Sequence, residues 1–441
     1  MAIAEPRSAL KPFHVLVLAL GGTAMSLAGF NLSWLAFALV ELREAWSLEP
    51  WQLSLPIVAS AIGGIWGSAA GGQLADRFGR RGVFQIAIAG CALGTLLSAG
   101  APNLAGLVVG QMILGAGVTG MTPAATTLVT EIAPTGARGR LTALLETFWV
   151  LGTLLAAISA YLLIPLMGWR GAMALGALAL LYIWVVRGLI PESPRFLVAR
   201  GYIADAFALR DRLAVRWGVD MALPMAEARP GLPLGVAGRL RELWSPAYRQ
   251  RTLVLWCLWF VLVFIYRGVF TWLPTLLVLV GQTAHDARFS LVVITLAQLP
   301  GTLVAAMLVD RVGRKPVLVV GLGAASLAAL LFGVVAETAI IAVLVGAAMS
   351  AFFMGGYSAG LVYTPELYPT RARATGVGMA SSFGRIAAIL APPAVSGLLV
   401  WGAGSLFPIF AMFAAALAGG AFVVGLLGEE TRGRLLEEVS R

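Results

Sequence analysis

The sequence predicts an all-α membrane protein of twelve transmembrane helices, arranged as two pseudo-symmetric six-helix bundles. Three observations predict this fold. Hydrophobic residues make up 59% of the 441 positions and charged residues only 12%, the apolar residues form long uninterrupted runs, and two charged motifs occur once in each half of the chain. Soluble domains carry about 25% charged residues, so lipid must cover most of this surface.

Twelve apolar runs are long enough to cross a bilayer. A helix needs roughly 20 apolar residues to span about 30 Å of hydrocarbon, and uninterrupted runs exclude a β-barrel, whose strands alternate. The runs cover residues 13–40, 53–75, 82–100, 105–130, 141–165, 170–190, 251–280, 289–309, 316–335, 339–363, 375–400 and 406–428.

The basic residues predict the orientation. Of the 31 Lys and Arg residues, Arg43, Arg170 and Arg288 fall on the side opposite the termini, while Arg267 and Arg385 fall inside spans. All the others lie on the side of the termini. Because basic loops stay in the cytoplasm, we expect both termini there, in a multi-pass membrane protein.

One long polar segment, residues 191–250, separates spans six and seven. Its stretches 202–216 and 236–245 have the pattern of short amphipathic helices lying on the membrane surface; a passive basic linker is the alternative. The expected domains are an amino-terminal bundle (1–190), this cytoplasmic linker, a carboxy-terminal bundle (251–428) and a cytoplasmic tail (429–441).

Two charged motifs of the first half recur in the second half at nearly the same offset. Duplicated halves place a substrate site between them near the bilayer midplane. We expect the motif side chains to form ion pairs that latch one conformation, although arginines that only set the orientation would produce the same pattern. The motif residues are Asp76, Arg77, Arg80, Glu131 and Arg138 in the first half, and Asp310, Arg311, Arg314, Glu366 and Arg373 in the second.

Over essentially its whole length the chain resembles the major facilitator superfamily, whose most specific signature is the first of these motifs. Within it, the chain resembles the metabolite–proton symporter and organic-ion branch, and especially bacterial nicotinate and aromatic-acid transporters. The resemblance implies a secondary transporter that works by alternating access in a bacterial inner (plasma) membrane. Its further motifs are Glu146-Thr-Phe-Trp-Val-Leu-Gly152, Leu243-Trp-Ser-Pro246 and Gly268-Val-Phe-Thr-Trp-Leu-Pro274, with the sugar-porter-like runs Pro191-Glu-Ser-Pro-Arg195 and Glu430-Thr-Arg-Gly-Arg434.

The chain departs from its proton-coupled relatives in helix 1. Those relatives carry an acidic Asp-Gly-x-Asp motif, whereas this sequence has Ala28-Gly-Phe-Asn31. Helix 4 has Gln111 where many relatives have an arginine, and helix 7 has Arg267 in place of the second residue of a tyrosine pair. Proton coupling through helix 1 is therefore in doubt.

Three ionisable residues lie well inside spans, where a charge is costly and marks a function by default. Arg385 and Arg267 predict an anionic substrate, because a guanidinium matches a carboxylate with two parallel hydrogen bonds. Glu146 is a candidate proton carrier or substrate contact. A structural pair between Glu146 and one arginine remains open.

Amide and aromatic side chains complete the candidate substrate site, since stacking suits a planar ring. For each of them a role in helix packing is the alternative. These candidates are Asn31, Trp149, Tyr266, Tyr357 and Phe383.

Other function classes lack support in the sequence. Two His and two Cys exclude a metal cluster, no phosphate-binding loop occurs, and no cofactor or nucleic acid is expected. We predict a monomeric carrier of a small organic acid, with protons as a candidate co-substrate. The alternatives are an organic-cation or drug carrier, a uniporter of neutral solutes such as sugars, and, from other classes, a channel or a non-transporting receptor.

Overall fold

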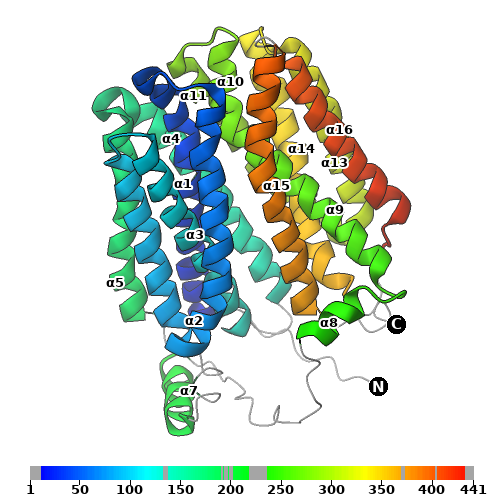
Figure 1. The fold of residues 1–441 in the computed structure, drawn as a ribbon. Helices are drawn as coiled ribbons and strands as arrows, with labels where there is room; N and C mark the ends of the chain where they lie inside the picture. The colour runs from blue at the N-terminus through cyan, green and yellow to red at the C-terminus, as the bar shows by residue number, and fades with distance from the viewer. Residues whose placement is uncertain are drawn as a thin grey trace. The chain divides into compact units, whose positions relative to one another are not determined.

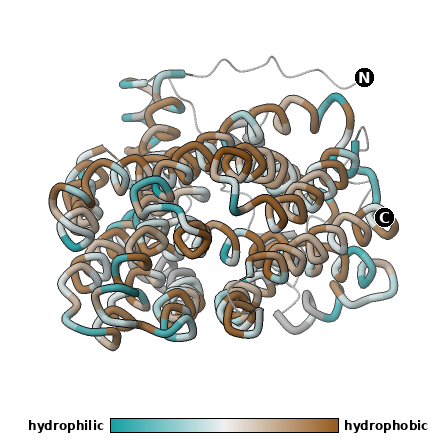
Figure 2. The backbone as a smooth tube through the Cα atoms, turned by 90° about the horizontal axis from the view of Figure 1, so that it is seen from above, coloured by the Kyte–Doolittle hydropathy of each residue, from teal (hydrophilic) through white to brown (hydrophobic). Residues whose placement is uncertain are grey.

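The computed structural model describes residues 11–132, 138–189, 192, 197, 202–217, 236–368, 373–402 and 405–432. Within these ranges the side chains of residues 69–78, 80, 123–124, 127–128, 130–132, 138–140, 142–143, 213, 236–237, 239–240 and 373–374 are not described. The described chain is helical along most of its length (Figure 1). Apolar residues line most of these helices (Figure 2).

The helices of the first half and of the linker follow each other in a simple order. They are α1 (Pro12–Trp46), α2 (Pro50–Ala99), α3 (Leu104–Ile132), α4 (Arg138–Ala174), the 3₁₀ turn η2 (Leu175–Leu178), α5 (Ala179–Leu189), α7 (Ile203–Trp217) and α8 (Val236–Leu243). The last two fall in the linker stretches for which the sequence predicts short amphipathic helices.

The second half contains eight α-helices and one π-helical segment among its described residues. They are α9 (Arg249–Ile265), the π segment η3 (Tyr266–Phe270), α10 (Thr271–Leu279), α11 (Ala284–Leu296), α12 (Gln298–Arg311), α13 (Arg314–Val335), α14 (Ala339–Glu366), α15 (Arg373–Trp401) and α16 (Phe407–Leu427).

Two glycines bend long helices into separate crossings. Gly79 in α2 (φ 83°) and Gly168 in α4 (φ 70°) adopt left-handed backbone angles that other residues rarely take. Ten helical stretches of the described residues are long and apolar enough to span a bilayer. Since the stretch through Gly168 holds two crossings and α2 has a further one before Gly79, the predicted twelve helices are confirmed.

Two predicted single helices prove to be interrupted. The run predicted at 251–280 is divided by the π segment Tyr266–Phe270, and the run predicted at 289–309 is divided after Leu296 into α11 and α12. Hydropathy does not reveal such interruptions, because a change in the backbone hydrogen-bond pattern leaves the residues as apolar as those of the flanking α-helix. π segments frequently occur at functional sites.

The chain forms two compact units. Unit 1 contains residues 1–32, 62–152 and 173–233, and unit 2 contains residues 33–61, 153–172 and 234–441. The boundary crosses α1, α2 and α4, so that the ends of these helices farthest from the chain termini pack with the carboxy-terminal helices. The predicted division at residues 190 and 250 stays a prediction.

The third crossing of each half begins with the same local structure. Gly313 (φ 123°) precedes α13, and Glu430 accepts hydrogen bonds from the backbone N–H groups of Arg314 and Lys315, both at 3.1 Å. In unit 1, Glu192 accepts from the N–H of Arg81 at 3.3 Å, two residues after Gly79. A carboxylate at a helix start satisfies N–H groups that have no partner within the helix.

Replacing Gly313 with alanine should destabilise this helix start. A Cβ atom there would lie 2.5 Å from Glu430 Oε2 on a backbone with φ +123°, and such strain costs on the order of 1–3 kcal/mol. Gly323→Ala is the matched control in the same helix, because nothing lies within 4 Å of its Cβ position. Thermal unfolding of the purified protein should show a lower melting temperature for Gly313→Ala alone. Equal melting temperatures for the two variants would contradict this explanation.

Candidate functional site

Arg267 lies in the π segment of unit 2, between α9 and α10. Its neighbour Gly268 is buried, and a Cβ atom at that position would lie 2.5 Å from the ring of Phe413. Because Gly268 has no side chain, α16 can approach the π segment closely. Among the described residues of unit 2, no carboxylate forms an ion pair with Arg267.

Arg385 lies on α15 in the same unit and is close enough to Arg267 for the two like charges to interact. Gly384 precedes it, and a Cβ atom there would lie 3.0 Å from Val263 and 3.1 Å from the carbonyl oxygen of Trp259. A small residue at this position brings α15 against α9. The structure thus brings together the two arginines that the sequence analysis singled out.

Aromatic side chains lie near Arg267 and on the stretch of α15 that carries Arg385. The rings of Tyr266 and Tyr357 are 6.2 Å apart, and both tyrosines are within electrostatic range of Arg267. Phe383, two residues before Arg385, stacks on Trp256 with a centroid distance of 4.7 Å and an interplanar angle of 24°. We call Arg267, Arg385, Tyr266, Tyr357 and Phe383 the arginine–aromatic cluster.

Several aromatic members of this region were not predicted from the sequence. Trp256, Trp259, Phe260 and Phe353 pack around Tyr357 and Phe383 at centroid distances between 4.7 and 6.2 Å. An apolar run around Trp256, Trp259 and Phe260 was visible in the sequence. Its helical phase relative to Arg267 was not, because the π segment shifts the register.

The unit 1 candidates lie on α1 and α4. Asn31 is 1% exposed; its Nδ2 donates to the carbonyl oxygen of Leu27 at 2.9 Å, and its Oδ1 accepts from Thr95 at 2.7 Å. These bonds join α1 to the third crossing, which gives Asn31 a packing role. A substrate contact of Asn31 stays a prediction.

Glu146 and Trp149 lie one turn apart on α4. Trp149 packs against the hydrophobic core of unit 1. Among the described residues of unit 1, no side chain forms an ion pair or hydrogen bond with Glu146. Phe148, directly before Trp149, packs on Gly22 of α1, where a Cβ atom would lie 2.6 Å from the ring. The proton-carrying role of Glu146 stays a prediction.

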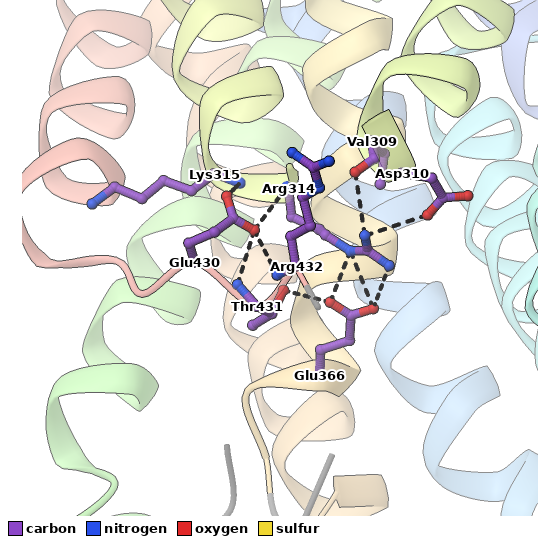
Figure 3. Close-up of polar contacts among 8 residues, drawn as sticks. All are labelled: Val309, Asp310, Arg314, Lys315, Glu366, Glu430, Thr431 and Arg432. Atoms are coloured by element: carbon purple, nitrogen blue, oxygen red, sulfur yellow. Dashed lines mark hydrogen bonds and ion pairs between the residues drawn. The ribbon is translucent and has the colours of Figure 1, made fainter. Parts of the chain in front are cut away.

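Ion pairs join three of the predicted latch residues of unit 2, where α13 begins and α14 ends (Figure 3). Their role as a latch stays a prediction. Arg314 Nη2 lies 3.1 Å from Glu366 Oε1, and Arg314 Nη1 lies 3.3 Å from Asp310 Oδ1. The Arg314 and Glu366 side chains are only 17% and 20% exposed, so water screens their attraction less than it would on the open surface. Arg311 is exposed beside them.

The chain after α16 joins this latch, which the sequence analysis did not foresee. Thr431 Oγ1 donates to Glu366 Oε2 at 2.5 Å, and Lys315 Nζ donates to the carbonyl oxygen of Gly428 at 2.9 Å (Figure 3). Glu429 forms a two-pronged ion pair with Arg251 of α9, with both N–O distances 2.9 Å. The tail therefore ties together α9, α13 and α14. In the sequence, the only indication of these tail contacts was that a glutamate follows the last helix of each half, Glu192 in the first and Glu430 in the second.

The other predicted latch residues lie outside the described side chains. They are Asp76, Arg77, Arg80, Glu131, Arg138 and Arg373.

A second set of contacts lies at the opposite end of the helices, within unit 2. The buried Arg288 of α11 forms an ion pair with Glu41 of α1. Ser54 of α2 donates to Ser396 Oγ of α15 at 3.0 Å. Tyr161 of α4 packs its ring 4.5 Å from that of His285. These far-end contacts hold amino-terminal helices against carboxy-terminal ones, and none of them was predicted.

Comparison with known proteins agrees with this architecture. The model of the family described as "Sugar (and other) transporter" matches residues 24–441. The niacin transporter of Acinetobacter baylyi is 37% identical over 97% of this chain and 96% of its own length. The putative niacin/nicotinamide transporter of Bacillus subtilis is 32% identical over 96% and 97% of the two chains.

A solved structure shares the fold at low sequence identity. The xylose transporter from E. coli, in its inward-open conformation, superposes with a TM-score of 0.76 at 18% identity, covering 97% of this chain and 99% of its own. The fold is therefore the two-bundle, twelve-helix fold of the major facilitator type.

The tail contacts of Glu430 predict a pH dependence. Burial raises the pKa of this carboxyl, but hydrogen bonds from the backbone N–H groups of Arg432, Arg314, Lys315 and Thr431 outweigh it and lower the pKa below the ordinary 4.5. A group with a lowered folded-state pKa stabilises the fold above its ordinary pKa and loses that contribution as the pH falls through the lowered value.

Glu430→Gln should therefore lower the melting temperature by a constant amount from neutral pH down to about 4.5. The difference from the unmodified protein should shrink only below that pH. Thermal unfolding in detergent at a series of pH values measures it. A difference that already disappears between neutral pH and the ordinary glutamate pKa would show that this carboxylate is not held ionised by the helix start.

Proposed function

Because this chain belongs to the sugar (and other) transporter family of the major facilitator superfamily, we propose that it carries a nicotinate-type carboxylate across the plasma membrane by alternating access. The observation that carries the proposal is the pair Arg267 and Arg385, held within electrostatic range of each other among aromatic rings of unit 2. As a membrane transporter the chain is not an enzyme, and its substrate is a small molecule.

The charge of the arginine–aromatic cluster favours an anion. A single charge at the centre of a bilayer costs at least about 2.5 kcal/mol on insertion scales, and two neighbouring positive charges also repel each other. A carboxylate would relieve both costs and accept parallel hydrogen bonds from a guanidinium. An organic cation would add to the repulsion.

The rings of the cluster favour a planar acid. Tyr266 and Tyr357 lie within electrostatic range of Arg267, and Phe383 lies two residues before Arg385 on α15. Aromatic faces and edges pack well on a flat heterocycle. Two of the relatives are named for niacin, the carboxylic acid of a flat ring. Their names and the chemistry of this cluster point to the same substrate class.

Alternating access requires contacts at the two ends of the helices that form and break in turn. The latch around Arg314 and the far-end contacts around Arg288 are suited to this role, because ion pairs and hydrogen bonds between helices are lost when those helices separate. In the proposed topology, with both termini cytoplasmic, the latch is on the inner side and the far-end contacts are on the outer side.

Glu146 is the proposed proton site. It is the one acid well inside a span of the amino-terminal half, and helix 1 lacks the acids of the proton-coupled relatives. A membrane-embedded carboxyl is easier to protonate than an exposed one, because burial disfavours its charged form. Transport as a monomer completes the proposal.

Arg385→Ala should weaken binding of nicotinate by roughly 2–5 kcal/mol, the range for removing one partner of a buried charge pair. Arg385→Lys should restore only part of the affinity, because lysine lacks the planar fork of arginine. Calorimetric titration of the purified protein measures both, with Arg249→Ala as a control that removes an exposed arginine. Equal nicotinate affinity in Arg385→Ala and in the control would contradict a substrate contact.

Glu146→Gln should abolish accumulation driven by a pH gradient while leaving exchange of labelled substrate across reconstituted vesicles intact. The reason is that glutamine keeps the shape of the side chain but cannot release a proton. Exchange in the same vesicles serves as the control for folding and insertion. Accumulation by the variant at the level of the unmodified protein would rule out Glu146 as the proton carrier.

Linking the far-end contacts should stop transport reversibly. The hydroxyl oxygens of Ser54 and Ser396 are 3.0 Å apart, so cysteines at both positions are within disulfide reach. In a background with Cys91 and Cys257 replaced by alanine, oxidation of Ser54→Cys/Ser396→Cys should block uptake into vesicles, and a reductant should restore it. Each single cysteine variant is the control. Undiminished uptake by the cross-linked protein would contradict alternating access.

A further inference from the structure

A cavity of about 630 Å³ lies in unit 1, between the linker helix α7 and the ends of the membrane helices. Its walls come from the start of α1, the third crossing, the end of α5 and the face of α7. In Figure 1, α7 lies beyond the lower ends of α5 and α2. In the proposed topology this is the cytoplasmic surface of the bilayer, at headgroup depth.

The cavity is strongly basic. Arg81, Arg187, Arg212 and Arg216 line it, and Asp211 is its one acidic wall residue among those described. The Asp211 carboxylate is already engaged, since Arg210 outside the wall donates to it at 2.8 Å. The described wall therefore carries four arginines against one acid, and Glu192 lies beside Arg81, where it accepts from the backbone N–H at 3.3 Å.

The floor of the same cavity is apolar. Phe13, Leu16 and Trp217 contribute to it, and the rings of Phe13 and Trp217 are 5.8 Å apart. Leu189 of α5, also in the wall, is 48% exposed. Trp184, which lies on α5 outside the wall, is 71% exposed. Exposed tryptophan is typical of the membrane–water interface, and the half-exposed Leu189 adds an apolar surface to the cavity wall.

We infer that this cavity binds the headgroup of an anionic phospholipid, with its phosphate held by the arginines and its acyl chains lying along α5. A positive pocket above an apolar, lipid-facing floor suits an amphiphilic anion better than a soluble one. Basic pockets of this kind on the cytoplasmic side of membrane proteins bind such headgroups. Because Arg212 and Arg216 belong to α7 while Arg81 and Arg187 belong to the membrane helices, the lipid fastens the linker helix α7 to the membrane helices of unit 1.

The inference is independent of the substrate and of the transport mechanism. It is tested by native mass spectrometry of the purified full-length protein titrated with phosphatidylglycerol and, separately, with phosphatidylcholine. Arg212→Gln/Arg216→Gln removes two cavity arginines from exposed positions of a surface helix. Arg241→Gln/Arg249→Gln removes the same charge from exposed positions of unit 2 and is the matched control.

The unmodified protein and the control should retain phosphatidylglycerol in preference to phosphatidylcholine. The cavity variant should bind phosphatidylglycerol at least about tenfold more weakly, since each basic residue near an anionic surface contributes about 1 kcal/mol. Equal retention by the cavity variant and the control would overturn the inference. Displacement of the lipid by an equal concentration of glycerol phosphate would overturn it too, because the site would then be one for soluble anions.

Discussion

The free-energy cost of placing a charge in a medium of low dielectric constant determines where the charged groups of this molecule lie. Its charged groups are few. Three sets of them lie at different levels of unit 2: the latch around Arg314, the cluster around Arg267 and Arg385, and the far-end pair of Glu41 and Arg288. At the two ends Arg314 and Arg288 each have an acid beside them. In the middle Arg267 and Arg385 lie within electrostatic range of each other, and the proposed carboxylate substrate would bring a negative charge to them.

Close packing makes this arrangement possible. Glycines stand next to both central arginines, at Gly268 and Gly384, where a Cβ atom would collide with a ring or a backbone carbonyl. Because these glycines have no side chain, α16 packs closely on η3 and α15 packs closely on α9, in the region where Arg267 lies within electrostatic range of Tyr266 and Tyr357. Arg267 itself lies in the π segment, and such segments frequently occur at functional sites.

Sequence patterns predicted the features that depend on local composition. Span lengths follow from the bilayer thickness, and Arg267 and Arg385 stood out because ionisable residues are rare in lipid. Features that depend on distant partners were not predictable. The Glu41–Arg288 pair joins residues 247 positions apart, and neither residue is unusual in its own segment. The bonds from Glu430 to the start of α13 likewise depend on a glycine backbone angle that no residue pattern reveals.

The most direct measurement compares two ligands that differ only in the group the arginines are proposed to hold. Nicotinate and nicotinamide share one ring, but the first carries a carboxylate and the second a neutral amide. Calorimetric titration of the unmodified protein should show nicotinate binding at least about tenfold more tightly, a difference of about 1.4 kcal/mol. Equal affinities, or tighter binding of nicotinamide, would contradict the assignment of the substrate's charge to Arg267 and Arg385.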